Sequence, residues 1–410
     1  MRGDVQPMIA LGAGLRAAGF DVRCAATEDF AEMVRRHGLE LFPLAGRAEA
    51  FFGGPAGNAL RERLRDAREY RRFFDNYLTL SYERQLAEAW EASRDADVVL
   101  CWPWTRMGPS LAEALRVPVF IVSMYPPLHL PTLAFANPFQ PVARETPGAQ
   151  AIRRSWRLAL PAMAVGERPL DAWRRHRLGL PSISWRKELR QLRRMPHLLG
   201  YSPVVLPRPL DWPAEVHVTG YWWLDEGAAY DPPEALAQFL AAGDSPVGIG
   251  FSSQVGPDTA RTNAMIIEAA ARAGVRVVLV GGFGALPEGT LPAHVCAVRS
   301  VPYEWLFSRA RAFVHQGGAG TVGSALRFGL PNFAVTFGYE QALWGNRLCE
   351  LGVGPPPIER SKLTVEELAS ALHQVATDRS MAARASAIGR EIAGEDGVGE
   401  AVRHIVAACR

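Results

Sequence analysis

Short apolar runs alternate with amphipathic stretches along most of the chain. This order is typical of α/β proteins with parallel sheets, because buried parallel strands read as apolar runs and the connecting helices carry one apolar face. In the first half the pattern predicts strands at Asp21–Ala25, Glu40–Pro43, Val98–Cys101, Val117–Val122 and Leu198–Tyr201, and helices at Pro7–Ala18, Asp29–His37 and Ala59–Glu91.

The second half repeats the alternation and then becomes helical. Strands are predicted at Val247–Phe251, Val275–Val280, Ala312–His315 and Asn332–Thr336, and helices at Ala260–Ala273, Tyr303–Phe307, Gly320–Phe328 and from Thr364 to the end. Between the halves, the stretch from Ser202 to Pro233 contains six prolines, which favours a linker and an irregular entry into a second domain.

The pattern therefore predicts two facing Rossmann-like α/β domains. We expect residues 1–205 to form the first domain, residues 206–392 the second, and residues 393–410 a C-terminal helix that packs back on the first. Ligands of such sheets bind outside the carboxyl ends of the strands, so the expected site is a cleft between the domains.

Composition narrows the class of protein. The chain has 410 residues and is 48% hydrophobic, which is ample for two cores. Its five cysteines are scattered without a Cys-x-x-Cys pair, so neither a disulfide framework nor a zinc site is expected. No apolar run approaches the roughly 18 residues that span a bilayer, and a cytoplasmic protein is predicted.

Charge is distributed unevenly although the net charge is only +3. Residues 1–200 contain 29 basic and 21 acidic residues, against 16 and 21 in residues 201–410. Most of the excess lies in residues 144–194, where arginines alternate with tryptophans. This pattern fits either an amphipathic helical hairpin with solvated arginines or a peripheral contact with an anionic membrane. Nucleic acid is not expected as a partner, since no recognised module accompanies the patch.

The most informative motif runs from Phe313 to Gly323, where a buried strand, a glycine turn and a helix start follow one another. Glycines let backbone N–H groups turn toward an anion, and the helix N-terminus adds a favourable dipole. Residues Gly318 to Gly323 also match G-x-G-x-x-G, the dinucleotide fingerprint. That fingerprint normally follows the first strand of its domain, whereas only one more convincing strand follows here, which disfavours a nicotinamide or flavin site.

A nucleotide sugar explains the neighbouring residues better. His315 stands at the strand tip and could donate to a diphosphate, while the adjacent Glu340 and Gln341 suit the paired hydroxyls of a hexose. Taken singly, His315 could be a satisfied strand-end histidine, and the Glu-Gln pair could be surface.

Several separated motifs occur in an order that resembles one enzyme family. They are Arg2 to Pro7, Gly38 to Leu44, Gly250 to Ser253, Val301 to Phe307, His315 to Thr321, Phe337 to Gly345 and Leu351 to Pro355. Together they resemble family 1 glycosyltransferases, in particular the branch of the sterol glucosyltransferases and their antibiotic-tailoring relatives. The resemblance covers nearly the whole chain.

This resemblance implies a glycosyltransferase B fold and an inverting, metal-independent transfer of a hexose from a nucleotide-diphosphate sugar, most often UDP-glucose. No cofactor is implied beyond that co-substrate. Asp4 matches the catalytic base. The donor-site matches are Val301 for the nucleotide base, Ser252 and Ser253 for the phosphate-side loop, His315, Gly317, Gly318, Ala319, Gly320 and Thr321 for the diphosphate, and Glu340 with Gln341 for the sugar hydroxyls.

The chain departs from the family pattern at three positions. Only three residues precede Asp4, where family members carry a complete strand, so the first N-terminal strand is expected to be missing and Asp4 could equally cap a helix. An added apolar strand of about ten residues is expected to raise stability and turnover. Gln316 stands at the second position of the usual His-His-Gly-Gly, and Glu340 replaces the more common Asp.

The acceptor is expected to be a hydrophobic small molecule such as a sterol, a polyketide or a lipid. Aromatic residues in or near loops of the first domain are the candidate contacts, although each could equally be core: Trp102, Trp104, Phe51, Phe52, Tyr77, Tyr125 and Phe135. The alternative function is a sugar-nucleotide or lipid-binding protein that keeps the fold without catalysis.

Overall fold

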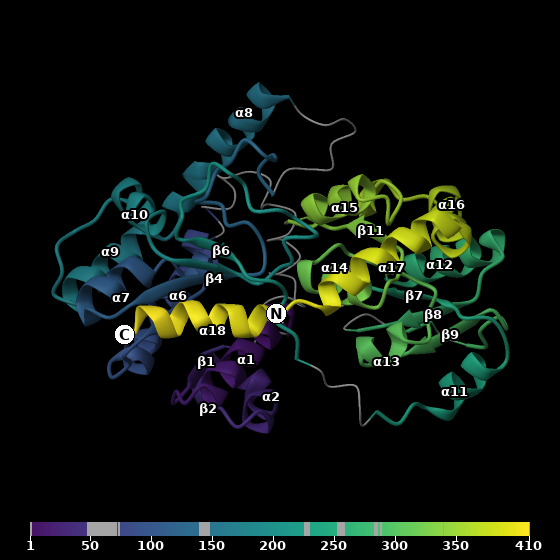
Figure 1. The fold of residues 1–410 in the computed structure, drawn as a ribbon, viewed down its shortest axis with the longest axis horizontal. Helices are drawn as coiled ribbons and strands as arrows, with labels where there is room; N and C mark the ends of the chain where they lie inside the picture. The colour runs from purple at the N-terminus through teal and green to yellow at the C-terminus, as the bar shows by residue number, and fades with distance from the viewer. Residues whose placement is uncertain are drawn as a thin grey trace. The chain divides into compact units, whose positions relative to one another are not determined.

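The computed structural model describes residues 2–46, 72, 74–138, 148–224, 230–251, 259–282, 286–287, 289–338 and 340–409. The chain forms two compact units (Figure 1). The first contains residues 1–138, 145–224 and 396–410, and the second contains residues 139–144 and 225–395.

The strands of the first unit form two parallel sheets in the described part of the chain. One pairs β1 (Arg23–Thr27) with β2 (Glu40–Leu44), and the other has the order β3 (Val99–Cys101), β4 (Val119–Ser123), β5 (His197–Leu199), β6 (Val216–Val218). Every residue of β4 and β5 is buried, as expected for central strands covered on both faces.

Helices surround these sheets. They are α1 (Arg2–Ala17), α2 (Ala31–Arg36), α6 (Thr79–Ser93), α7 (Gly108–Leu115), α8 (Ala149–Ala159), α9 (Glu167–His176), α10 (Trp185–Leu192) and α18 (Gly397–Ala408), with short turns η1 (Glu28–Phe30), η2 (Phe74–Leu78), η3 (Pro103–Thr105) and η4 (Leu160–Ala164). The described part of the segment 144–194 contains α8, η4, α9 and α10, with an irregular stretch between His176 and Trp185, and its Trp156 and Trp173 are buried.

The last helix of the chain, α18, belongs to the first unit (Figure 1). It packs against α1, where Gly14 lies so close to Val398 that a Cβ at Gly14 would overlap the valine side chain. The predicted boundary at residue 205 is wrong, because β6 pairs with β5 and carries the first unit on to Leu224.

The second unit is built on one six-stranded parallel sheet. Its order is β12 (Ile358–Glu359), β11 (Asn332–Thr336), β10 (Ala312–His315), β7 (Val247–Gly250), β8 (Val277–Val280), β9 (Val295–Val298). Chain order reverses between β7 and β10, so these two neighbouring strands form the topological switch point, where ligands of open α/β sheets bind.

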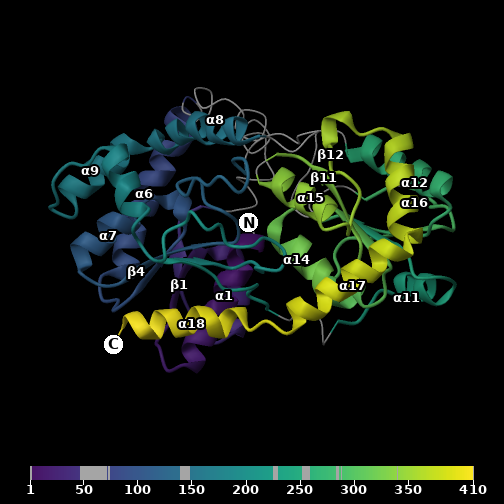
Figure 2. The same ribbon diagram turned by 45° about the horizontal axis from the view of Figure 1, so that its top comes forward.

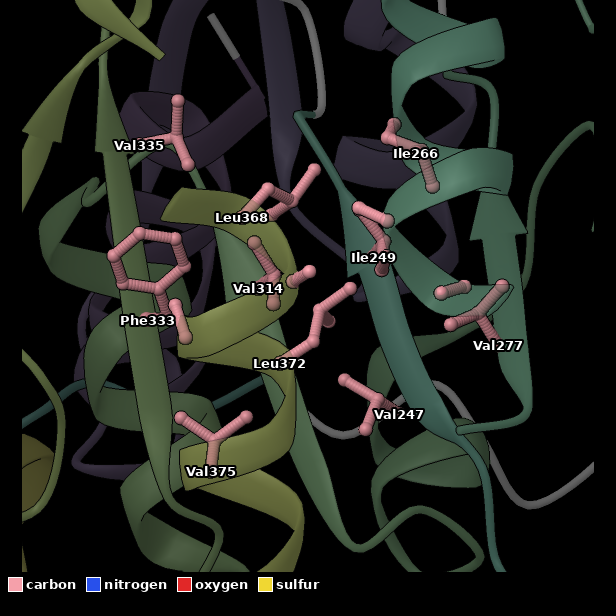
Figure 3. Packing of buried hydrophobic residues seen from close by; sticks show 14 of the residues in the cluster. Val247, Ile249, Ile266, Val277, Val314, Phe333, Val335, Leu368, Leu372 and Val375 are labelled. Atoms are coloured by element: carbon pink, nitrogen blue, oxygen red, sulfur yellow. The ribbon is translucent and has the colours of Figure 1, made fainter. Parts of the chain in front are cut away.

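Helices cover this sheet as well. They are α11 (Glu234–Ala241), α12 (Thr259–Ala273), α13 (Tyr303–Phe307), α14 (Ala319–Arg327), α15 (Gln341–Glu350), α16 (Val365–Thr377) and α17 (Arg379–Ala393), with the turn η6 (Arg360–Lys362). Helices α12 and α16 contact each other, and Figure 2 shows them side by side. Leu368 and Leu372 of α16 pack onto strand residues such as Val314, which closes the core of this unit (Figure 3).

Most predicted elements are present with small shifts at their ends, but three strands were not predicted. Of the helix predicted at Ala59–Glu91, residues 59–71 and 73 lie outside the described residues, and the described part contains η2 and α6. Strand β6 lies within the proline-rich stretch that was expected to be a linker, and β9 and β12 are only four and two residues long. The helix predicted at Pro7–Ala18 already begins at Arg2 and accommodates Pro7 in its interior.

Candidate functional site

The glycine motif occupies the carboxyl end of β10, at the switch point of the second unit. His315 ends the strand, opposite Gly250 of β7 on one side and Ala334 of β11 on the other. Phe313 and Val314 are fully buried and anchor the strand. The turn that follows is therefore held by a rigid sheet, as a binding loop for a charged ligand requires.

The His315 ring is held by two hydrogen bonds. The backbone N–H of Gly317 donates to its Nδ1 at 2.9 Å, so that Nδ1 carries no proton. Its Nε2 therefore carries the proton and donates to Oδ1 of Asn332 at 2.9 Å, while Nδ2 of Asn332 donates to the carbonyl of Leu330. Burial lowers the pKa of His315 to about 4, which keeps the ring neutral at pH 7.

This geometry corrects the expectation that His315 donates a hydrogen bond to a diphosphate. Both ring nitrogens already have partners within the protein, and the side chain is fully buried. His315 instead fixes the first amide of the glycine turn. Sequence reasoning missed its partner Asn332, although a polar residue at the start of an otherwise apolar strand was an available signal.

Two glycines shape the turn between His315 and α14. Gly317 has φ +85°, and a Cβ there would lie 2.9 Å from the carbonyl oxygen of Gln341, so only glycine fits. Gly318 is the N-cap of α14, in extended conformation. The N–H groups of Ala319, Gly320 and Thr321 lie in the first turn, where a helix provides no acceptor for them. A helix N-terminus of this kind is suited to binding an anion.

The loop that carries Glu340 and Gln341 touches the glycine turn through Gly317. Gln341 is 4% exposed, and its Oε1 accepts a hydrogen bond from the backbone N–H of Phe337 at 2.7 Å. Glu340 is half-buried at the N-cap position of α15. The two predicted parts of the donor site are thus brought together, with the Gln341 oxygen used to hold its own loop.

Gln316 projects from the same turn and is 9% exposed. Its Oε1 is buried and has no hydrogen-bond partner among the described residues. A buried carboxamide oxygen without a donor is unfavourable. A ligand with an N–H or O–H group would therefore satisfy it.

The remaining donor-site predictions are placed in part. Val301 is buried between β9 and α13, in the same unit as the glycine turn. Tyr303, two residues later, contacts the rings of Phe307 and Phe313 and so connects this segment to β10. Ser252 and Ser253 lie outside the described residues.

Asp4 belongs to the first unit and lies inside the first turn of α1, half-buried. Because the helix begins at Arg2, Asp4 is not its N-cap, which corrects that alternative. Helix α1 is tied to the end of the unit by Gln6, whose Nε2 donates to the carbonyl of Leu224 at 3.1 Å.

Three of the predicted acceptor-site aromatics cluster. Trp102 and Trp104 follow β3, and Tyr125 follows β4, so all three lie at the carboxyl ends of neighbouring parallel strands. The rings of Trp102 and Tyr125 pack edge to face with their centroids 6.0 Å apart, and Nε1 of Trp104 donates to the Tyr125 hydroxyl. Trp104 is 36% exposed, so the cluster reaches the surface.

The other aromatic candidates do not join this cluster. Phe135 packs instead with Trp156 and Trp212. Tyr77 lies in η2, and its side chain is outside the described part of the chain, as are Phe51 and Phe52.

The fold and the glycine turn define a class of protein: two Rossmann-like domains with parallel sheets, which is the glycosyltransferase B fold. Residues 1–129 match the glycosyltransferase family 28 N-terminal domain, and residues 266–408 match the erythromycin biosynthesis protein CIII-like C-terminal domain. The chain thus carries an N-terminal and a C-terminal domain that both match glycosyltransferase domains, and it is related to sterol glucosyltransferases and similar in fold to antibiotic glycosyltransferases.

Individual relatives agree with this assignment. Sterol 3-beta-glucosyltransferases of Aspergillus fumigatus and Emericella nidulans are 33% and 34% identical to this chain over 98% of its length. The chain spans only 29% of the length of each.

Solved structures share the fold over the full chain. The glycotransferase of kitacinnamycin has a TM-score of 0.74 at 20% identity and covers 100% of this chain and 97% of its own. The calicheamicin glycosyltransferase CalG4 has a TM-score of 0.68 at 19% identity, covering 100% and 96%. VinC in complex with dTDP has a TM-score of 0.65 at 22% identity, covering 99% and 96%. Within the described residues, none of the helices is both long and apolar enough to cross a membrane.

Proposed function

We propose that the chain transfers a hexose, foremost glucose from UDP-glucose, to a hydroxyl group of a hydrophobic acceptor. The observation that carries the proposal is the turn from Gly317 to Thr321, which aims the N-terminus of α14 outward at the switch point of a parallel sheet. The dTDP in the VinC structure supports a nucleoside diphosphate as the ligand of such a fold.

The proposed reaction is a direct displacement that inverts the anomeric carbon and needs no metal ion. The acceptor oxygen forms a bond to that carbon as the bond to the diphosphate oxygen breaks, and the hydroxyl proton passes to Asp4. Negative charge grows on the leaving diphosphate. Amide donors in the first turn of α14 stabilise that charge, because they are already oriented and need no reorganisation.

The acceptor is proposed to be a sterol, a polyketide or a lipid. This follows from the cluster of Trp102, Trp104 and Tyr125, which offers flat apolar surface together with one hydroxyl group. The sterol glucosyltransferases and antibiotic glycosyltransferases among the relatives bind acceptors of this kind by their names. A cytoplasmic location is proposed along with it.

The test is Asp4→Asn, with Glu32→Gln as its control. Both replace a first-turn helix acid by its amide, and Glu32 lies in α2. We expect Asp4→Asn to keep UDP binding by calorimetry and to lose transfer by about 10²- to 10⁴-fold, as for removal of a general base. Glu32→Gln should keep both.

Product formation is followed by mass spectrometry, with nucleotide sugars screened against sterol, polyketide and lipid acceptors. A product mass identifies donor and acceptor together. Unchanged transfer by Asp4→Asn would remove that residue from the mechanism. UDP binding without turnover on the whole panel would favour a non-catalytic binding protein of the same fold.

A further inference from the structure

The segment from residue 148 to residue 195 carries an unusual excess of positive charge. It contains twelve Arg and Lys residues but only three acids, Glu167, Asp171 and Glu188. Glu188 forms a buried ion pair with Arg106, and Oε1 of Glu167 accepts from the backbone N–H of Trp185 at 2.8 Å. Asp171 accepts from Arg175, Ser182 and the backbone of Ile183. Every carboxylate of the segment is thus already engaged.

Helix α8 presents part of this charge on one face. Arg153, Arg154 and Arg157 are exposed, and no ion pair is recorded for them within the described part of the chain. Leu158 lies beside them and is 63% exposed. Their spacing places the four side chains on one side of the helix. We call these four residues the α8 face.

The opposite side of α8 explains why this orientation is fixed. Ile152 and Trp156 are buried there, and Nε1 of Trp156 donates to the carbonyl of Phe135 at 3.0 Å. The helix therefore cannot rotate to bury Leu158. An apolar side chain stays exposed among three arginines.

A second group of cations lies nearby in the same unit. Arg186, Lys187 and Arg190 are exposed on α10, and α10 contacts η4, which directly continues α8. Arg186 also lies over the ring of Trp185, 4.8 Å from its centroid. The two helices that adjoin η4 thus both carry exposed cations, and none of these cations forms an ion pair with another described residue.

We propose that the α8 face docks on an anionic lipid surface. Cations near such a surface are attracted by its negative potential, and an exposed leucine among them inserts at the boundary of headgroups and acyl chains. A nucleic acid would also bind the three arginines through its phosphates, but its affinity would not depend on Leu158. Docking of the α8 face requires neither sugar donor nor acceptor, so it is independent of the transfer reaction. It would bring the enzyme to acceptors that are dissolved in the lipid.

The test is sedimentation of the full chain with vesicles of phosphatidylcholine, with or without phosphatidylglycerol. We expect binding only to the anionic vesicles and weakening by salt. The double variant Arg153→Glu, Arg157→Glu should bind at least about tenfold more weakly, since each cation near the surface contributes measurably. The matched control is Arg379→Glu, Arg390→Glu on α17, two exposed arginines of the second unit, which should bind as the parent does.

Two further measurements separate lipid binding from plain charge. Leu158→Ser should reduce the vesicle binding that remains at high salt and leave heparin affinity unchanged. The proposal is overturned by absence of vesicle binding, by equal loss in the α17 control, or by tight binding to a DNA duplex with none to vesicles. Thermal unfolding monitors the fold of each variant, and the exposed position of all five residues predicts unchanged midpoints.

Discussion

His315, the last residue of β10, and Asn332, the first residue of the neighbouring β11, form a hydrogen bond between two fully buried side chains. Since Nδ1 of the histidine accepts from Gly317, the bond to Asn332 selects the tautomer in which Nε2 carries the proton. Asn332 thereby orients the ring, and the ring orients the first amide of the turn. A residue one strand away thus helps to shape the proposed diphosphate site.

Substitution of Asn332 is expected to change the protonation of His315. Asn332→Leu leaves the buried Nε2–H without an acceptor and should lower the free energy of unfolding by about 1–3 kcal/mol. Asn332→Asp keeps an acceptor oxygen and adds a negative charge, so it should raise the pKa of His315. Ring ¹⁵N shifts measure tautomer and pKa directly. A parent ring protonated at Nδ1 would contradict this assignment.

The stability of the second unit should depend on pH through His315. Its pKa is about 4 in the folded chain and near 6.5 when unfolded, so the unfolded state binds more protons between these values. The stabilisation is complete above pH 6.5 and is lost as the pH falls toward 4. Between pH 7 and pH 5 the loss is about 2 kcal/mol.

Urea unfolding at the two pH values measures this loss. The variant His315→Gln should be less stable at pH 7 but less sensitive to pH. His197 of the first unit also has a pKa of about 4 because it is buried, and it acts as an internal comparison. An equal pH dependence of the second unit in parent and variant would show that another group is responsible.

Gly317 should resist substitution where Gly320 does not. In Gly317→Ala the new Cβ would meet the carbonyl oxygen of Gln341 at 2.9 Å, and φ is +85°. The left-handed conformation alone costs about 1–2 kcal/mol, and UDP binding should fall as the amides shift. Gly320 lies in the first turn of α14 with open space around it, so Gly320→Ala should keep or raise stability by up to about 1 kcal/mol. Equal stability of the two variants would argue against the turn geometry.

The fold could be predicted from sequence where the local pattern and the tertiary environment agree. Strands β10 and β11 lie where the apolar runs predicted them, because fully buried parallel strands leave a continuous apolar signal. Strand β12 has two residues, too few to leave a pattern, and β6 lies among prolines that indicated a linker. The pairing of β6 with β5 is a tertiary fact that no local signal contains.

The candidate site divides in the same way. The glycine turn was predictable because its residue types determine backbone conformation locally. The role of His315 was not, since it depends on Asn332, which is 17 residues away and reaches it only through sheet pairing. Sequence likewise indicated Trp104 and Tyr125 as aromatic candidates, but their hydrogen bond follows from the parallel register of β3 and β4.

The Trp104–Tyr125 pair is expected to act on the acceptor and not on the donor. Tyr125→Phe removes the oxygen that accepts from Nε1 of Trp104, so the indole should lose its fixed orientation. We expect the KM for the acceptor to rise about fivefold, the value of one hydrogen bond, with the KM for the nucleotide sugar unchanged. Trp104→Phe should raise this KM by a similar factor. The double variant should raise it by less than the product of the two single factors. Independent, multiplicative effects would show that the pair does not act as a unit.

The final prediction concerns the sheet edges of the first unit. Within the described residues, β1 pairs with β2 alone and β3 pairs with β4 alone, so each of these two strands has one unpaired edge. Helix α6 packs on both β2 and β1 before the chain enters β3, and Arg23 of β1 forms an ion pair with Asp95 just ahead of β3. The edges of β1 and β3 that have no partner strand among the described residues therefore border the same region.

An apolar strand of about ten residues placed ahead of Met1 should pair with the free edge of β1, since α1 then serves as a right-handed crossover between the two. We expect a higher free energy of unfolding, slower hydrogen exchange of amides in Cys24–Thr27 and faster transfer, because Asp4 would follow directly from a fixed strand. A Gly/Ser segment of equal length is the control, since it cannot pair stably. If both extensions leave these amides equally exposed, the edges do not accept a strand, and the contacts of α1 with α18 and β1 and the hydrogen bond from Gln6 to Leu224 suffice to position Asp4.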